Sequence, residues 1–573
     1  MQGLTLSLDV WSLVFQHTEK NDLCSLCLVS RTFNTLATPL LYRSISLIAL
    51  DPNRMSRWRS KEQIGQGRPT QPTGHWYLLS RLEDETHSTP RHYVQELALS
   101  IPKAVGQLDK EFLTHLLKDS RLFNLISFRL PNLRRVSLTL ETLQSEPIIR
   151  AIENHPRKPE LTLSIQNAGK PAPEPFGDAP LPSVTKLTVT VSPFDEGDGQ
   201  NRRVLVVQRL LFNCPNVRSL SLTVRWKYGG CVRRRPRYPI TTSFQFSGTE
   251  VFPPIEELLL DGYRISDDEW PHWRDRFEWS RLSSLTLGPQ NTSGVLSRFA
   301  GYATALAALS VRSYRGERNM DREGLTVFLS SFDSLKMLDL RGYICSVRAI
   351  AQHSKLETLC LHEDESAGEG SARAVLTVEE LEYLDKQCPN LRVLKVDIQR
   401  GDNQLPTTVL TKLATGFKNL RSLSLHFELG LRDIKHPITP TLNYVSVQSI
   451  GQSFFDERIQ YGIADPTSSF ALTLWTGNCY RRWPQWEPPH ASFEKQFTAS
   501  YEIRLSEGAK NCVDRKVEVR HLQKERLDAL IEARKRNIFG DLSAYEFSHL
   551  RTRVAAAVEG PTEALMEEVG KTG

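Results

Sequence analysis

Residues 388 to 396 read Cys-Pro-Asn-Leu-Arg-Val-Leu-Lys-Val, a turn followed by aliphatic residues at positions 391, 394 and 396. Pro389 and Asn390 favour the turn, and the aliphatic spacing fits a short strand with one buried face. Directly upstream, Val378 to Cys388 has the apolar spacing of a helix. Helix, turn and short strand therefore form one structural unit.

The aliphatic triplet recurs along most of the chain from position 94. The copies are Val94-Leu97-Leu99, Leu133-Val136-Leu138, Val184-Leu187-Val189, Val217-Leu220-Leu222, Ile255-Leu258-Leu260, Leu282-Leu285-Leu287, Leu306-Leu309-Val311, Leu335-Leu338-Leu340, Leu356-Leu359-Leu361, Leu391-Leu394-Val396, Leu420-Leu423-Leu425 and Leu442-Val445-Val447. Stacked units of this kind bury one face of each element against their neighbours and share one elongated core. Spacings from 21 to 51 residues indicate an irregular array with insertions.

This alternation resembles leucine-rich repeats. The predicted fold class is α/β, an irregular leucine-rich-repeat solenoid with parallel strands and a helical or irregular convex side, preceded by three short N-terminal helices. An ordinary α/β domain with apolar strands is the alternative that the pattern leaves open.

The N-terminal helices are predicted from residues 6 to 45. Asp9 is a candidate N-cap for the first helix, the second begins at Asn21 or Asp22, and Pro39 ends the third. About forty residues seldom bury enough surface to fold robustly alone, and this stretch carries more apolar side chains than so small a bundle can cover. We therefore expect a partner to complete it.

The same stretch, notably Asp22 to Ile45, resembles an F-box of the type found in fungal proteins, and the Cys-Pro-Asn-Leu form resembles the repeats that often follow F-boxes. Ser7 stands where the family usually has Pro. The resemblance implies docking to a Skp-type adaptor and, through it, to a cullin scaffold. The implied adaptor-binding residues are Leu6, Leu8, Val10, Trp11, Phe15, Leu23, Leu26 and Val29. A plain helical cap on the repeat array is the alternative.

The chain divides by composition into four parts: an F-box over 1–50, a polar linker or insert over 51–92, the repeat array over 93–450 and a capping extension over 451–573. The extension contains two expected strands, at 470–475 and 500–505, and a charged helix from His521 to Arg536. The acidic stretch from Glu363 to Ala372 is predicted to be a solvated loop.

Composition favours a folded protein of 573 residues, with 40% hydrophobic and 24% charged residues. A net charge of +6 is too mild to predict a nucleic-acid or membrane partner. Nine scattered cysteines and the lack of a long apolar run predict a protein of the cytoplasm or nucleus. Cys24 and Cys27 have zinc-like spacing without a second ligand pair, which favours core cysteines.

No motif of catalysis, metal binding or cofactor binding is found, so we expect neither an enzyme nor a cofactor. Two other segments are candidates for binding. The basic cluster Arg233 to Arg237 is either a solvated insert or a nuclear address or docking patch for acidic partners. The aromatic and basic residues of Tyr480 to Trp486 either hold a loop against the end of the solenoid or stack on a base or a proline-rich peptide.

The array offers the better binding surface. If the second and third aliphatic residues of each copy face the core, the residues that flank the third face the other side together. Successive copies place there a mixed-charge polar strip, from which we predict the target-binding residues Arg312, Asp339, Arg341, His362, Lys395, Asp397 and His426. Such a strip suits recognition of a protein by complementary charge and hydrogen bonds.

Together these features predict the substrate-recognition subunit of a Skp-cullin-F-box type ubiquitin ligase, which binds the adaptor through its N-terminal helices and an unidentified target protein through the array. The alternative is a repeat scaffold that acts outside ubiquitin transfer.

Overall fold

The structure is a computed structural model of the chain. It describes residues 7–48, 78, 81–84, 89–100, 120–140, 146–166, 179–191, 202–225, 243–288, 295–312, 322–342, 345–363, 365, 373–399, 405–430, 438, 441–463, 470–477, 497–506, 516–525 and 528. The chain forms two compact units, Met1–Glu278 and Trp279–Gly573.

Three helices begin unit 1: α1 (Leu8–Gln16), α2 (Lys20–Cys27) and α3 (Arg31–Arg43). Ser7, rather than the predicted Asp9, is the N-cap of α1, and its side chain accepts a hydrogen bond from the Val10 amide at 3.4 Å. The φ of Ser7 is −64°, the value that proline imposes. Serine therefore keeps the backbone geometry of the usual proline and adds a cap.

Pro39 lies inside α3 and does not end it, contrary to the prediction. A proline within a helix costs about 3 kcal/mol because it removes a hydrogen bond and crowds the preceding turn. Beyond it, Leu40 and Leu41 pack against the small core of Phe15, Leu23 and Ala37. Burial of these two side chains offsets the cost, so the helix continues to Arg43.

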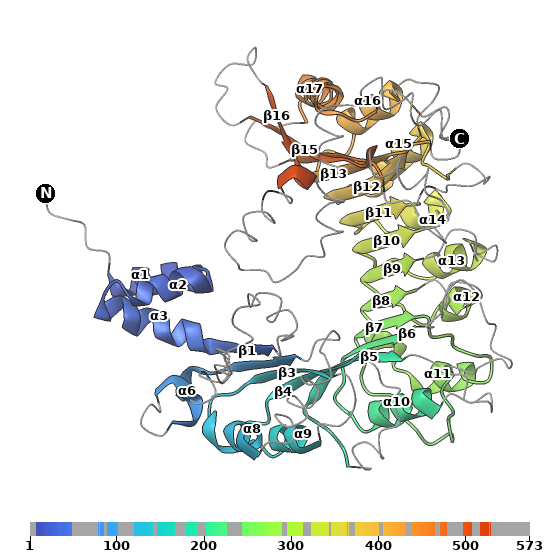
Figure 1. Ribbon diagram of the computed structural model, residues 1–573. Coiled ribbons are helices and arrows are strands. Elements are labelled where there is room, and N and C mark those ends of the chain that lie inside the picture. The colour runs from blue at the N-terminus through green and yellow to red at the C-terminus, as the bar shows by residue number, and fades with distance from the viewer. Residues whose placement is uncertain are drawn as a thin grey trace, which may run out of the picture. The chain divides into compact units, whose positions relative to one another are not determined.

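Parallel strands follow in unit 1, and each pairs with the next in chain order. They are β1 (Ser44–Ile48), β2 (Glu96–Ser100), β3 (Arg135–Leu140), β4 (Glu160–Ile165), β5 (Val184–Val191), β6 (Ser219–Val224) and β7 (Glu257–Asp261). The helical segments are α6 (Thr89–Tyr93), α8 (Ser120–Asn124), the π-helix η3 (Leu125–Arg129), α9 (Glu146–Glu153), α10 (Arg202–Phe212) and α11 (Trp270–Arg276). Figure 1 shows α8, α9 and α10 on one side of these strands.

Unit 2 repeats the arrangement. Its strands are β8 (Ser284–Leu287), β9 (Ala308–Arg312), β10 (Met337–Arg341), β11 (Thr358–His362), β12 (Val393–Ile398), β13 (Ser422–Phe427), β14 (Ala471–Trp475), β15 (Ser500–Leu505) and β16 (Val517–His521). From β8 to β14 neighbouring strands are parallel, and β15 and β16 are antiparallel.

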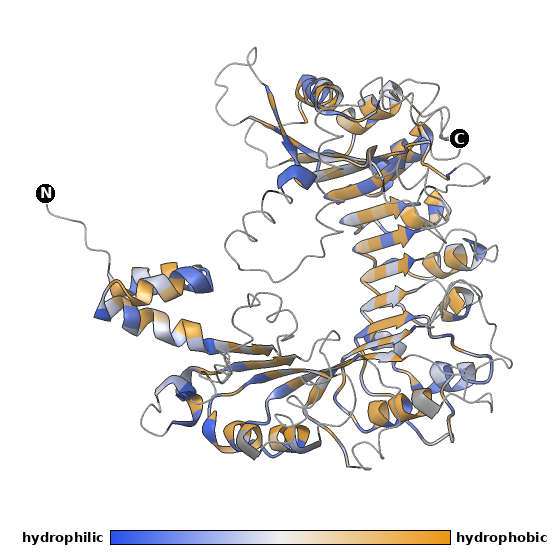
Figure 2. Cartoon of the chain, in the orientation of Figure 1, coloured by the Kyte–Doolittle hydropathy of each residue, from blue (hydrophilic) through white to orange (hydrophobic). Residues whose placement is uncertain are grey.

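The helical segments of unit 2 are η4 (Trp279–Arg281), α12 (Val295–Phe299), α13 (Arg322–Leu329), α14 (Val347–Ala351), α15 (Val378–Gln387), α16 (Thr407–Thr415) and α17 (Tyr444–Gln460). Helices α12 to α16 follow one side of the strands (Figure 1). Colouring by hydropathy shows apolar and polar residues alternating along strands such as β8 (Figure 2). None of the helices in the described ranges is long and apolar enough to span a membrane.

The asparagine of the turn motif links neighbouring repeats. The Asn390 side chain donates a hydrogen bond to the Ser354 carbonyl, in the turn of the preceding repeat, at 3.0 Å. The same bond joins Asn132 to His92, Asn216 to Pro182 and Asn419 to Pro389. A turn carbonyl that would otherwise lack a partner is thereby satisfied. The asparagine at this turn position thus connects successive repeats, whether or not a proline precedes it.

The α/β class and the repeat array are confirmed. In each copy from Val94 to Leu425 the second and third aliphatic residues lie in a strand. The last predicted copy, at 442–447, is wrong: these residues begin α17, because Asn443 and Ser446 form a reciprocal capping box. The parallel array also extends to β14, past the predicted boundary at residue 450, and starts at β1 within the predicted F-box range.

The strand β4 was missed by the sequence pattern. It fills the gap of 51 residues between two predicted copies, and its Leu161 and Leu163 are fully buried. The first aliphatic position of this copy is occupied by Lys158, which adopts a positive φ of 44°. A lysine at that position hides the copy from a search for aliphatic triplets.

Both strands predicted in the extension are present, as β14 and β15. Most of the predicted charged helix, His521 to Arg536, lies outside the described residues, as do Leu6, Arg233 to Arg237 and Tyr480 to Trp486. The expectation that both Cys24 and Cys27 belong to a core is wrong for Cys24, which is exposed on α2.

Candidate functional site

Helix α1 and the residues that follow α2 carry large aliphatic side chains that are exposed. We call this group the helical apolar patch, and it consists of Leu8, Val10, Leu13, Val14, Leu28 and Val29. Leu28 is 89% exposed and Val29 is 67% exposed, although both are large aliphatic residues. Val10, Leu13 and Val14 are three and four residues apart on α1 and so share one face, and a group of exposed aliphatic residues of this kind marks an interaction site rather than ordinary scatter.

The aromatic residues of the helices are not on this surface. Phe15 is 1% exposed and packs against the ring of Phe33, with the ring centroids 5.1 Å apart and the planes at 86°. Trp11 lies against the same ring at 5.0 Å. These three rings, with Leu23 and Ala37, form the internal core of the bundle.

The predicted adaptor-binding residues therefore separate into two sets. Leu8, Val10 and Val29 are on the helical apolar patch, whereas Phe15 and Leu23 are buried and Trp11 and Leu26 pack partly against them. The prediction omitted Leu13, Val14 and Leu28, which are exposed. Both faces of α1 are apolar, so its sequence alone does not show which face points inward.

The second surface is formed by the strands of unit 2. We define the outer face as the side chains of β9 to β13 that alternate with the buried aliphatic residues. Strand pairing is in register, so that Arg312 is aligned with Arg341 and His362, and Asp397 with His426. The prediction that successive copies present their polar residues in common rows is confirmed.

The predicted target-binding residues differ in their exposure to solvent. Arg312, Arg341 and Lys395 are exposed, and Asp339 is half-buried. His362, Asp397 and His426 are buried, with Asp397 4% and His426 0% exposed. The last three form a cluster within the protein instead of a surface that contacts a target directly. Whether any of the seven binds a target stays a prediction.

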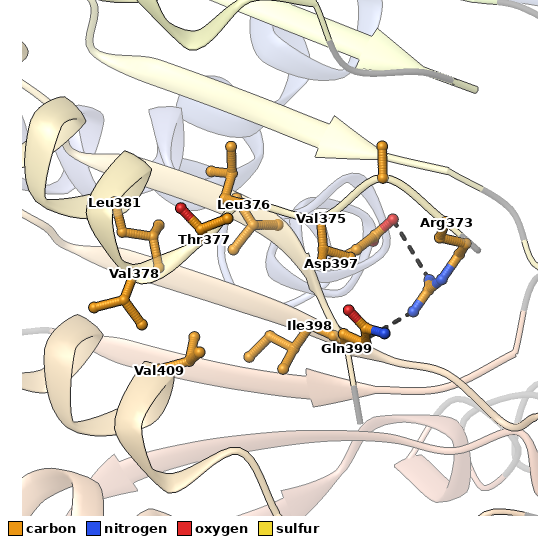
Figure 3. A pocket seen from close by; sticks show the side chains of 12 residues that line it. Arg373, Val375, Leu376, Thr377, Val378, Leu381, Asp397, Ile398, Gln399 and Val409 are labelled. Carbon is orange, nitrogen blue, oxygen red and sulfur yellow. Dashed lines mark hydrogen bonds and ion pairs between the residues drawn. The ribbon is translucent and has the colours of Figure 1, made fainter. Parts of the chain in front are cut away.

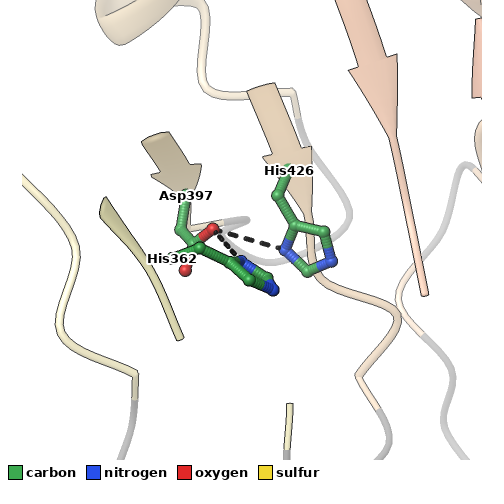
Figure 4. A group of neighbouring side chains, drawn as sticks. All are labelled: His362, Asp397 and His426. Atoms are coloured by element: carbon green, nitrogen blue, oxygen red, sulfur yellow. Dashed lines mark hydrogen bonds and ion pairs between the residues drawn. The ribbon is translucent and has the colours of Figure 1, made fainter. Parts of the chain in front are cut away.

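Asp397 is the centre of the buried cluster (Figure 4). One of its carboxylate oxygens lies 2.8 Å from Nδ1 of His362, and the other accepts the backbone amide of Glu363 at 2.7 Å. Nη1 of Arg373 lies 3.5 Å from the second oxygen. Burial raises the pKa of Asp397, but the hydrogen bond from His362 and the charge of Arg373 lower it by more, so the carboxyl stays ionised.

His426 is held in its neutral form. Burial, reinforced by the nearby charge of Arg373, lowers its pKa to about 3. Nη1 of Arg373 donates to Nδ1 of His426 at 2.6 Å, which leaves Nε2 to donate to the Gly477 carbonyl at 2.8 Å. Although Nδ1 is 3.6 Å from the Asp397 carboxylate, this contact is not an ion pair, because the ring carries no charge.

His362, Asp397 and His426 are residue types that bind metals, and their ligand atoms lie within 4.8 Å of one another. The hydrogen bonds and ion pairs of the cluster, however, are made with the guanidinium of Arg373. The guanidinium of Arg373 already supplies positive charge to Asp397 and a donor to His426, and both nitrogens of His426 are engaged. A metal ion would have to displace this side chain against charge repulsion. The cluster is therefore organised around arginine.

Two glutamates in the segment that follows β11 extend the cluster. Glu363 accepts the Ala374 amide at 3.1 Å, and Glu365 accepts the amides of Leu429 and Gly430. Both glutamates are buried. The prediction of a solvated acidic loop is therefore wrong for these two residues, because backbone amides that need acceptors fix their carboxylates.

A pocket of about 540 Å³ lies beside the cluster (Figure 3). Its walls are mostly aliphatic side chains of β12, α15, α16 and the segment before α15, with Asp397 and Arg373 at one end. The volume is in the range of small-molecule sites. The two charged groups at its end are bonded to each other and to their protein neighbours, so the pocket offers mainly an apolar surface.

No family model matches the chain, and no curated protein matches it. Among solved structures the chain is similar to the crystal structure of a TLR13–ssRNA13 complex, at 14% identity and a TM-score of 0.31, over 59% of this chain and 47% of that one. The chain thus spans about half the length of that protein. At this level of similarity we draw no conclusion about this chain from that structure, and the fold assignment depends on the strand order described above.

Proposed function

We propose that this protein is the substrate-recognition subunit of a Skp-cullin-F-box type ubiquitin ligase. The observation that carries the proposal is the helical apolar patch, on a segment whose sequence resembles an F-box. Full burial of an aliphatic side chain contributes about 1.5–3 kcal/mol, so a partner that covers several of these residues gains a strong driving force for binding. The resemblance of this segment to an F-box implies that the partner is a Skp-type adaptor.

The strands of unit 2 supply the second binding function in this proposal. Their exposed polar residues are held by a stack of buried leucines, which is a rigid support for recognition of a target protein. Ubiquitin transfer then depends on effective concentration: a target bound to the same assembly meets the ubiquitin-carrying enzyme without a diffusional search. No bond chemistry is required of this chain.

The proposal is tested by copurification with a purified Skp-type adaptor. The double variant Val10→Asp/Leu28→Asp places two charges in the helical apolar patch, and we expect it to lose adaptor binding, because an unpaired charge at a buried interface is costly. Thr32→Asp/Thr35→Asp, a pair of exposed changes on α3 that add the same charge, is the matched control and retains binding. Circular dichroism verifies that both variants fold.

Two results would contradict the proposal. Undiminished adaptor binding by the double variant would place the contact elsewhere, and failure of the unaltered protein to bind any Skp-type adaptor would favour a repeat scaffold outside ubiquitin transfer. One observation favours that second candidate: the leucines of β9 to β13 are fully buried by their neighbours, so this array needs no contribution from an adaptor.

A further inference from the structure

The outer face carries two arginines side by side. Arg312 on β9 and Arg341 on β10 are register partners on adjacent parallel strands. Neighbouring strands are about 4.8 Å apart, so the two cations extend from nearly the same place. Like charges in directly opposed positions repel each other and destabilise a sheet unless an anion lies between them.

Asp339, on β10, is the carboxylate that the described residues place beside these two arginines. Nε of Arg341 donates to its two oxygens at 3.2 and 3.3 Å, and Ser310 donates to one of them at 3.4 Å. Its side chain is 17% exposed, against 50% for Arg341. Among the described residues, no carboxylate forms an ion pair with Arg312 or with Lys395 on β12. Arg312 and Lys395 therefore face solvent without a carboxylate partner from the described part of the chain.

Lys395 extends the positively charged region across the strands, from β9 to β12. Arg312 and Lys395 are separated by three strand spacings and by two residues along the strand, a distance of roughly 16 Å. An extended peptide covers this distance in about five residues. Such a peptide would lie across the strands, with one acidic side chain near the two arginines and another near Lys395.

We propose that the outer face of β9 to β12 binds an acidic, carboxylate-rich segment of a protein. This inference deepens the proposed function, on which it rests for the biological role of the contact, by naming the chemistry of the target. Arg312 and Lys395 are the recognising cations, and Arg341, which is bonded to Asp339 through Nε, lies beside Arg312. The guanidinium groups provide the forked donor geometry that suits carboxylates.

A protein segment fits this face better than a nucleic acid does. Single-stranded nucleic acid binds where cations line a groove and aromatic side chains stack on the bases. In the described residues of β9 to β12, the side chains that alternate with the buried aliphatic residues include no tryptophan, tyrosine or phenylalanine. Small and polar residues, such as Ser310 and Thr358, lie between the cations instead.

The full chain is tested with a fluorescent peptide of alternating Glu and Ser, about ten residues long so that it spans the face. We expect binding that weakens as salt is added and that is lost when every Glu in the peptide is Gln. Arg312→Gln is expected to lower the affinity about threefold, and Arg312→Glu/Lys395→Glu about tenfold or more. Lys418→Glu, a reversal of one charge at an exposed site outside the outer face, is the control.

Three results would overturn the inference: equal binding of the Gln peptide, an equal loss of affinity in Lys418→Glu, or tighter binding of a single-stranded oligonucleotide of matched length and charge. Adaptor copurification of the same variants separates this test from that of the proposed function. If Arg312→Glu/Lys395→Glu retains the adaptor but loses the peptide, the two surfaces act independently, as proposed.

Discussion

The strands of unit 2 bury their leucines completely, whereas the N-terminal helices leave some of theirs exposed. Leu309, Leu338, Leu359, Leu394 and Leu423, at equivalent positions of successive strands, are each 0% exposed. In α1 and at the end of α2, by contrast, Leu13 is 58% and Leu28 is 89% exposed. Similar side chains thus serve as core in one region and as surface in the other.

The difference follows from how each region obtains neighbours. In the array, both edges of each strand pair with the strands of the units before and after it. After the last parallel strand, the antiparallel strands β15 and β16 continue this pairing. Of the three short helices, α3 contacts α6 and β1, and the core that the helices form consists of Phe15, Leu23 and Ala37 with partly buried residues around it. We infer that the array is stable by itself and that the helices depend on a partner.

The largest effect is expected within the array. Leu394→Ala should lower the free energy of unfolding by about 3 kcal/mol, the usual range for a fully buried leucine being 2–5 kcal/mol. Lys395→Ala, one residue further and on the outer face, should change it by less than about 0.5 kcal/mol. Urea denaturation followed by fluorescence measures both. Equal losses for the two variants would refute the alternation of faces.

The buried cluster predicts an acid-sensitive array. The pKa of His426 is lowered to about 3 in the folded protein, against about 6.5 for an unfolded chain. The unfolded state therefore binds more protons between these values, and the stability contributed by the neutral ring is present above pH 6.5 and lost as pH falls. The slope from this group is up to about 1.4 kcal/mol per pH unit.

His426→Gln tests this prediction, because an amide can still accept from Arg373 and donate to Gly477. We expect the variant to have a shallower decline in stability between pH 6.5 and 4.5 than the unaltered protein. Below that range the lowered pKa of Asp397 adds a further loss in both proteins. If the stability difference between the two proteins is the same at pH 7 and pH 5, the ring is not held neutral by the fold.

The sequence predicted the array well because its signal is local. Turn residues and aliphatic spacing are enough to place strands, and the register follows from the turn, which also explains why the rows of the outer face were correctly predicted. The failures have local causes as well: Lys158 interrupts the triplet before β4, and the capping box of Asn443 converts an aliphatic triplet into a helix start.

The candidate sites were less predictable because exposure depends on distant residues. His362, Asp397 and His426 are on the outer face by alternation, yet Arg373 and the segments near Glu365 and Gly477 enclose them. Neither alternation nor residue type reveals a contact made across a sequence separation of 53 residues, as between Arg373 and His426. Helix α1, likewise, has apolar residues on both faces, so its sequence does not show which face is buried. The contact between Phe15 and Phe33 shows that the face of Phe15 is the buried one.

The smallest effect is expected at Leu28, and it discriminates most directly between the two regions. Because this side chain is 89% exposed, Leu28→Ser should change the stability of the isolated protein by less than about 0.5 kcal/mol. In the adaptor complex the lost burial should weaken binding about tenfold, because burial of a leucine contributes roughly 1.5–3 kcal/mol.

The control is Leu23→Ala, which changes a residue of α2 in the core of the bundle and should instead destabilise the isolated protein. Thermal melting and titration calorimetry measure the two quantities. A marked loss of stability in Leu28→Ser would mean that the chain itself covers this leucine, and the helices would then need no partner.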